Sequence, residues 1–197
     1  MSWSIAELWE EQRAKDIARE IGNHDNIRTL YCGPAVVVWI AAVWNLNRGR
    51  SYNYMSRLAD KNLFPDGPRD FTTTGSVPGF QNSLEAILKR ETDKELHLSN
   101  DTYYRYGSIH DQLERHDMPI IIRFKGSGFT DGLHYVTLYK SEKDRRAWRP
   151  DRIQFYWQDN GTYGKRDIGN PGLYKSEWRT IGLSGSFKFG AKRVVRN

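Results

Sequence analysis

The feature that most restricts the fold is the segment from Gly33 to Asn47, which is apolar on almost every side when it is drawn as a helix. Gly33 and Pro34 suit the first turn, because proline there loses no hydrogen bond and its φ is already helical. A helix that is apolar all round has to be buried. At 197 residues, the chain is long enough to enclose it, and we expect a single domain spanning residues 1–197.

The first half of the chain has helical patterns. A capping box, Ser4 to Glu7, precedes an amphipathic segment, and one helix is expected from Ile5 to Ile21, with Gly22 as its C′ residue. The segment from Leu63 to Gly79 is rich in proline and glycine and is expected to be a long surface loop. Ser51 is expected to cap a third helix that runs to about Asn62, and further helices are expected from Phe80 to Arg90 and from Ser108 to His116.

The second half of the chain has strand patterns. The β-branched run Ile120 to Phe124 is typical of a buried strand. Other strands are expected over Leu133 to Tyr139, Ile153 to Trp157, Trp178 to Leu183, Ser186 to Phe189 and Arg193 to Val195. Helices followed by antiparallel strands predict an α+β fold, in which N-terminal helices pack on an antiparallel sheet.

Composition restricts the cellular setting. The apolar segment from Ala35 to Val43 is too short to cross a membrane, and the N-terminus has no pattern of a secretory signal. A single cysteine allows no intrachain disulfide, so a reducing compartment is compatible with the chain. The net charge of +6 favours acidic partners: nucleic acid, an acidic protein or an acidic inhibitor. The basic clusters Lys143 to Arg146 and Lys192–Arg193 are interpreted as solvated hairpin tips and tails rather than as a nucleic-acid site.

Cys32 is the only cysteine, and it directly precedes Gly33 and Pro34. At a helix N-terminus, unpaired N–H groups and the macrodipole favour a thiolate. Cys32 is therefore a candidate nucleophile, although a lone cysteine is often a small buried apolar residue with no chemistry.

A cysteine nucleophile needs a base and a group that orients the base. His134 opens one expected strand, and Asp159 follows the next strand in a turn sequence. The start of the first strand of an antiparallel pair lies beside the end of the second, so these two residues are expected to be neighbours. Each alone has a structural interpretation: His134 as an ordinary strand residue and Asp159 as the start of an Asx turn. His24, His97, His110 and His116 are interpreted as surface or structural residues.

No spacing of ligand residues indicates a metal site, and no glycine motif for phosphate binding is present, so no cofactor is expected.

Three motifs together resemble those of papain-like cysteine peptidases: Tyr31–Ala35, Leu133–Val136 and Trp157–Gly161. Within that group, the chain most resembles the double-glycine leader peptidases of bacteriocin exporters. The resemblance implies a papain-like fold, with the nucleophile at the start of the buried helix. It implies that Cys32 attacks a carbonyl carbon, that His134 moves the proton, and that Asp159 orients the imidazole.

The family commonly has a glutamine six residues before the cysteine, where it completes the oxyanion hole with the backbone N–H of the cysteine. This chain has Asn26 at that position, one methylene shorter and still able to donate; His24 is a weaker alternative. Asn160 competes with Asp159 as the orienting group.

The resemblance also implies a role. The chain lacks a transporter segment and looks like a free-standing bacterial toxin or effector. Such a protein would be cytoplasmic in its producer, be delivered into the cytoplasm of a target bacterium, and cleave a protein there after a double-glycine motif. An acidic immunity protein would cover its active site, leaving a monomer or a heterodimer with that inhibitor. Alternatives are a peptidoglycan amidase, a deamidase or a transglutaminase with the same triad, and a basic nucleic-acid-binding domain in which Cys32 is structural.

Overall fold

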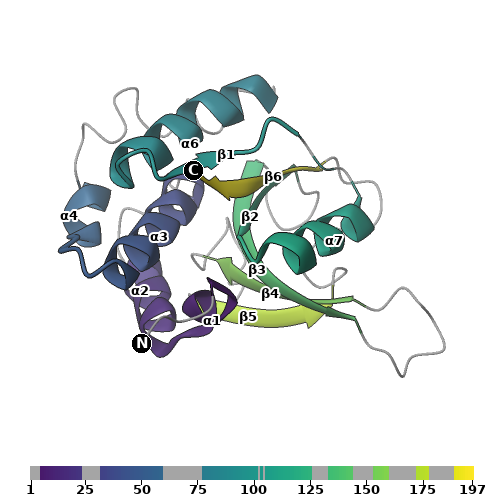
Figure 1. Ribbon diagram of the computed structural model, residues 1–197, viewed down its shortest axis with the longest axis horizontal. Coiled ribbons are helices and arrows are strands. Elements are labelled where there is room, and N and C mark those ends of the chain that lie inside the picture. The colour runs from purple at the N-terminus through teal and green to yellow at the C-terminus, as the bar shows by residue number, and fades with distance from the viewer. Residues whose placement is uncertain are drawn as a thin grey trace.

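The computed structural model describes residues 5–23, 32–59, 77–101, 103, 105–125, 133–143, 153–159, 172–177 and 189–197. The helices are α1 (Ile5–Glu10), α2 (Gln12–Asn23), α3 (Cys32–Asn47), α4 (Tyr54–Ala59), α6 (Val77–Glu91) and α7 (Tyr106–His116). The strands are β1 (Leu96–Leu98), β2 (Ile120–Lys125), β3 (Leu133–Lys143), β4 (Ile153–Asp159), β5 (Gly172–Glu177) and β6 (Phe189–Arg196). This order, shown in Figure 1, has the α+β character expected from the sequence.

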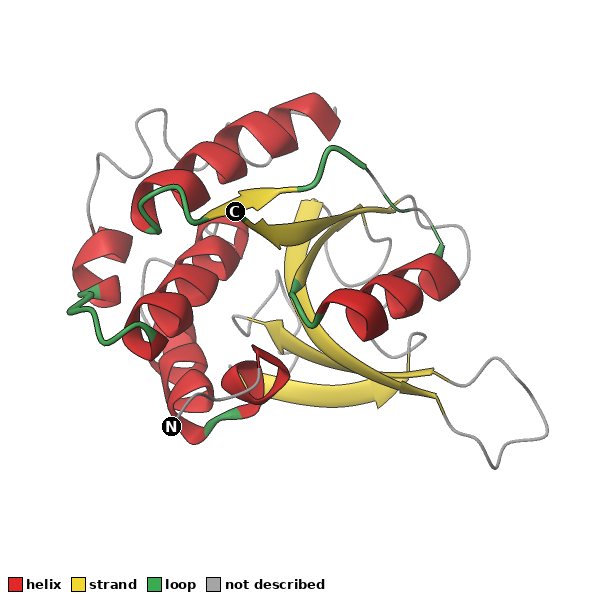
Figure 2. Cartoon of the chain, in the orientation of Figure 1, coloured by secondary structure: helices red, strands yellow, loops and turns green. Residues whose placement is uncertain are grey.

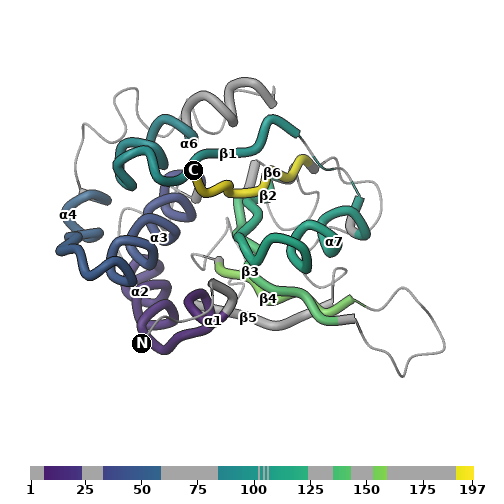
Figure 3. The backbone as a smooth tube through the Cα atoms, in the orientation of Figure 1, coloured from purple at the N-terminus to yellow at the C-terminus, as the bar shows by residue number. Residues whose placement is uncertain are grey.

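The strands form one antiparallel sheet in the order β1-β6-β2-β3-β4-β5. Five of them, β2 to β6, make up most of the sheet, and the short β1 pairs with the last residues of β6. The final strand of the chain thus lies between β1 and β2, as the tube of Figure 3 shows. A register shift between Leu138 and Lys140 marks a bulge in β3 opposite β4.

The two faces of the sheet bury separate sets of apolar side chains. Ile121, Tyr135 and Tyr139 belong to a large cluster with α1, α2, α3 and α6. Their neighbours on the same strands, Val136 and Leu138, belong to a second cluster with α7. Side chains alternate between the faces of a strand, so each face of the sheet receives its own helical cover. Figure 2 shows α7 on one side of the central strands and the N-terminal helices on the other.

Helix α3 is the centre of the larger cluster. Every residue from Ala35 to Ala42 has an exposed fraction of 0%. Helices α2, α4 and α6 and strand β3 all contact α3. The indole N–H of Trp39 donates to the carbonyl of Ala14 on α2 at 3.0 Å, which satisfies the polar atom of this buried ring. The prediction that this apolar helix is enclosed by the rest of the chain is confirmed.

The single helix expected from Ile5 to Ile21 is wrong, because the helix is interrupted at Glu11. In an uninterrupted helix, Leu8 and Ile17 would lie on opposite sides, about 180° apart around the axis. Both are buried, with exposed fractions of 2% and 4%. The break therefore lets α1 and α2 each turn an apolar face to the core. Gly22 is not a C′ residue either, since it is buried within α2.

Other boundaries also differ from the expectation. Asn53, not Ser51, caps α4: its side-chain oxygen accepts from the backbone N–H of Ser56 at 2.8 Å. Helix α6 begins at Val77, so the end of the expected loop up to Gly79 is helical. Strands β1 and β5 were not predicted at all. The strands expected over 178–183 and 186–188 lie outside the described residues, as does the loop over 63–76.

Within the described ranges, the structure has no helix whose length and apolar character would allow it to cross a bilayer.

Candidate active site

Cys32 is the first residue of α3, one position earlier than the predicted helix start. Its backbone therefore lies where the N–H groups of a helix have no intrahelical acceptor. The rest of the first turn is buried, including Gly33 and Pro34. The backbone of Cys32 thus begins α3, directly before residues that are packed in the core.

Gly33 is the contact between the first turn of α3 and the sheet. A Cβ atom added to Gly33 would lie 3.3 Å from both Cδ2 and Cε2 of Tyr135 and 3.5 Å from Cδ2 of Leu84. Tyr135 is on β3 and has an exposed fraction of 1%. Only glycine allows so close an approach without displacing the ring. The residue after Cys32 therefore packs on the residue after His134.

The register of the sheet brings His134 and Asp159 to the same end of the β3–β4 pair. Thr137 pairs with Gln158, so Asp159 follows this pair on β4 and His134 precedes it by three residues on β3. The backbone of His134 pairs with Phe124 of β2, and that of Asp159 pairs with Gly172 of β5. The two strands are antiparallel neighbours, as the hairpin argument requires.

For the three residues of the predicted triad, the structure describes the backbone only. The side chains of Cys32, His134 and Asp159 lie outside the described residues, as do all of Asn26, His24 and Asn160. The roles assigned to these residues remain predictions.

Three buried polar side chains lie in one row across the sheet, with an isoleucine among them, and sequence reasoning missed this row. Lys192, Ile121, Thr137 and Gln158 are successive register partners on β6, β2, β3 and β4. The exposed fractions of Lys192, Thr137 and Gln158 are 1%, 0% and 0%. The alternation of side chains along each strand could have predicted their burial, because it places these residues on the same face of the sheet as Tyr135. The interpretation of Lys192 as part of a solvated tail is therefore wrong.

The ammonium of Lys192 is held by backbone carbonyls. Its Nζ donates to the carbonyl oxygens of Ser99 and Asn100, each at 3.0 Å. Burial lowers the pKa of Lys192, and the negative charges of Glu85 and Asp101 partly oppose this effect. The lysine therefore fixes the segment after β1 against β6.

Two of the remaining histidines have structural surroundings. His110 on α7 lies 2.7 Å, through Nδ1, from the hydroxyl oxygen of Ser141 on β3, which ties α7 to the sheet. His116 lies at the surface at the end of α7, where the partial loss of water around its ring and the positive charges of Arg193 and Arg115 lower its pKa. Both observations agree with the structural interpretation of these residues.

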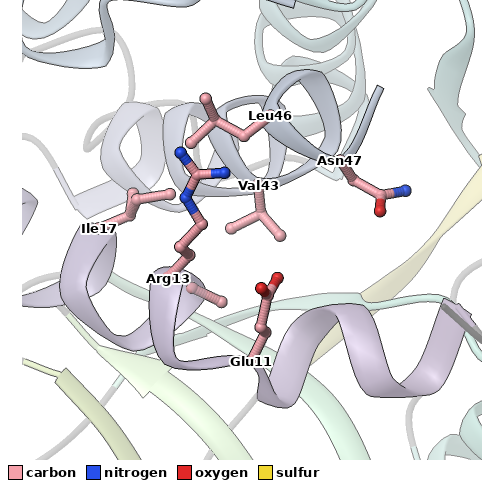
Figure 4. Close-up of a pocket in the computed structure, with 7 residues that line it drawn as sticks. Glu11, Arg13, Ile17, Val43, Leu46 and Asn47 are labelled. Atoms are coloured by element: carbon pink, nitrogen blue, oxygen red, sulfur yellow. The ribbon is translucent and has the colours of Figure 1, made fainter. Parts of the chain in front are cut away.

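The described residues contain no group of three or more histidine, cysteine, aspartate or glutamate side chains that could hold a metal ion. Among the cavities lined by described residues, one lies at the end of α3 (Figure 4) and another lies between α1, α7 and β3. Neither is lined by Cys32, His134 or Asp159.

Comparison of the chain with protein-family models, with curated proteins and with solved structures finds no match.

Proposed function

We propose that this chain is a cysteine endopeptidase with a papain-like fold and a Cys32–His134–Asp159 triad. The observation that carries the proposal is the contact between Gly33 and Tyr135, because it joins two motifs through residues that lie 102 positions apart in the sequence. Each contact residue directly follows a proposed catalytic residue. The β3–β4 register adds support, since it brings Asp159 to the end of the sheet where His134 lies.

In the proposed reaction, His134 takes the proton from the Cys32 thiol, and the thiolate attacks the carbonyl carbon of the scissile peptide bond. The C–N bond then breaks as His134 returns the proton to the leaving amine, and an acyl-enzyme remains. Water hydrolyses the thioester, with His134 as its base, and restores the thiol. Asp159 holds the imidazole in orientation and stabilises its charged form.

The negative oxygen that forms during attack needs hydrogen-bond donors. The backbone N–H of Cys32 is one donor, because it belongs to the first turn of α3. The Asn26 side chain is the proposed second donor. Loss of such a donor typically costs about 100-fold or more in rate.

The proposed biological role is that of an interbacterial toxin that cleaves a cytosolic protein after a double-glycine motif. Its producer would need an immunity protein, and the net charge of +6 favours an acidic inhibitor that covers the active site. Delivery into the target cytoplasm would keep the single thiol reduced.

The test is expression of the wild type and of Cys32→Ala in the bacterial cytosol, with mapping of new protein termini across the proteome. We expect new termini that follow Gly-Gly with the wild type and none with Cys32→Ala. His134→Ala should also abolish them, and Asp159→Ala should reduce them less severely, because orientation of the base is then lost rather than the base itself.

His110→Ala is the matched control, because His110 contacts Ser141 on β3 and has no proposed part in the reaction. It should leave the new termini unchanged. Equal termini from the wild type and Cys32→Ala would refute the proposal and favour a nucleic-acid-binding domain. Toxicity that requires Cys32 only after export to the periplasm, without new termini, would favour a peptidoglycan amidase.

A further inference from the structure

Two basic side chains, Arg193 on β6 and His97 on β1, lie on neighbouring strands of the sheet (Figure 1). Ala191, two residues before Arg193, packs in the cluster formed with α7, so Arg193 is on that face of the sheet. His97 is the register partner of Val195, which places it on the same face. The two basic residues are thus diagonal neighbours, with about 7–8 Å between their Cβ atoms, and one small ligand can contact both side chains.

Both side chains are half-buried, and within the described residues neither forms an ion pair or a hydrogen bond. Nε of Arg193 and Nδ1 of His97 are shielded from solvent, so water does not replace the missing partners at these atoms. A guanidinium keeps its charge in a protein, and a charge that is partly removed from water is costly unless an anion compensates it. The terminal nitrogens of Arg193 and Nε2 of His97 are the atoms that remain for such an anion.

A second guanidinium lies close to Arg193, at the end of α7. The pKa of His116 is lowered by the partial loss of water around its ring and then by the positive charges of Arg193 and Arg115, and Asp117 opposes these effects. Charges shift a pKa from close range, so both guanidinium groups lie near this histidine. Arg115 is exposed and has no ion pair within the described residues. Arg193, His97 and Arg115 therefore form a basic corner between β6, β1 and the end of α7.

We propose that the basic corner binds the phosphate group of a small molecule. Its three donors come from different elements and approach a ligand from different directions. A tetrahedral phosphate has acceptor oxygens in all of these directions, whereas a carboxylate has its acceptors in one plane. The two arginines contribute charge-assisted hydrogen bonds, and Nε2 of His97 donates one more. This inference is independent of the proposed peptidase activity.

The probes are inorganic phosphate and glycerol 3-phosphate, added to the full chain at neutral pH and constant ionic strength. Binding is followed by the backbone amide chemical shifts of residues 96–99, 114–117 and 192–196. We expect saturable shifts with a dissociation constant on the order of 1 mM for inorganic phosphate, as suits a ligand of about five non-hydrogen atoms. Acetate should bind at least about fivefold more weakly, because it is planar and has a single charge. An affinity for glycerol 3-phosphate at least about tenfold higher would identify a phosphate ester as the ligand, and equal affinities would identify the free ion.

Arg193→Gln and His97→Phe should each weaken phosphate binding about fivefold or more. Arg105→Gln is the matched control, because Arg105 lies at the other end of α7 and its loss changes the net charge by the same amount as Arg193→Gln. It should change binding less than about twofold, since a distant exposed charge is screened by salt. An amide spectrum that retains the wild-type pattern shows that each variant is folded.

Three results would overturn the proposal: no shifts at about 20-fold the expected dissociation constant, acetate binding as tight as phosphate binding, or unchanged binding in both Arg193→Gln and His97→Phe. Shifts caused by a DNA oligonucleotide but by neither small phosphate would also overturn it and would favour a nucleic-acid surface.

Discussion

Glu95 is the residue at which the end of α3 is joined to the turn after α6. Its carboxylate accepts from the indole N–H of Trp44 at 2.6 Å, from Nε of Arg48 at 3.2 Å and from Arg50 at 2.5 Å. Burial alone would raise the pKa of Glu95, but the donors Trp44, Arg50 and Arg48 outweigh it and hold the pKa below its ordinary value. The charged form of Glu95 is therefore favoured by folding.

This direction predicts how stability depends on pH. A carboxylate with a lowered pKa stabilises the fold above its unfolded pKa of about 4.3, and this contribution is lost as the pH falls through the lower folded pKa. Urea unfolding should show a free energy of unfolding that falls on acidification below about pH 5. Glu95→Gln should lower the free energy of unfolding by about 1–2 kcal/mol at pH 7 and should make this free energy depend less on pH. Glu114→Gln, exposed on α7, is the control, and an unchanged pH dependence in Glu95→Gln would contradict the assignment.

At the same scale, the sequence offered candidate catalytic residues by type and order, but it did not predict which residues surround them. Cys32 was recognisable because Gly33 and Pro34 mark a helix start, and structure places it there. The sequence could not show that Tyr135 contacts Gly33, because a contact between residues 102 positions apart depends on how α3 packs on the sheet. Lys192 was predicted to be solvated because only its charge was considered. In the structure its ammonium donates to backbone carbonyls, and no sequence pattern reveals such partners.

At the scale of elements, the packing of α3 on β3 connects stability to the proposed chemistry. Alanine at position 33 would gain helix propensity of up to about 1 kcal/mol over glycine. Its Cβ would nevertheless lie 3.3 Å from the ring of Tyr135, which is itself buried and has little room to yield. We expect Gly33→Ala to destabilise the protein by about 1 kcal/mol in urea unfolding. The strain should also displace the first turn of α3 and slow alkylation of Cys32 by iodoacetamide.

Gly107→Ala is the matched control, because a Cβ at this position in α7 meets no atom within 4 Å. It should leave alkylation unchanged and preserve or increase stability through helix propensity. If Gly33→Ala behaves like Gly107→Ala in both measurements, the close contact with Tyr135 does not position the start of α3.

The break between α1 and α2 shows why element boundaries were harder to predict than element types. The capping box and the amphipathic pattern identified helical sequence correctly from Ile5 onward. Whether that sequence stays continuous depends on which neighbours cover Leu8 and Ile17, and this is a tertiary property. The strands β1 and β5 illustrate the same limit, because β1 has three residues and β5 has no clear apolar alternation.

At the scale of the whole molecule, the fold class followed from the sequence because its strongest signal was global. An apolar helix needed cover, and the helical first half and strand-rich second half could supply it. In the structure, this cover comes from an antiparallel sheet whose two faces pack on different helices. The order β1-β6-β2 could not be foreseen, since it requires the last strand to insert between two earlier ones.

This architecture predicts unequal local stability. Helix α3 is enclosed by α2, α4, α6 and β3, whereas α4 has six residues and contacts mainly α3 and α2. Tyr54 also contacts Glu20 at the surface, and the half-exposed Arg57 pairs with the buried carboxylate of Glu91, but these polar contacts give α4 much less cover than α3 receives from its neighbours. Native-state hydrogen exchange should therefore show protection factors in α4, at Arg57 and Leu58, at least about 100-fold below those in the centre of α3. Equal protection in both helices would mean that α4 opens only when the core unfolds, and that it belongs to the same cooperative unit as α3.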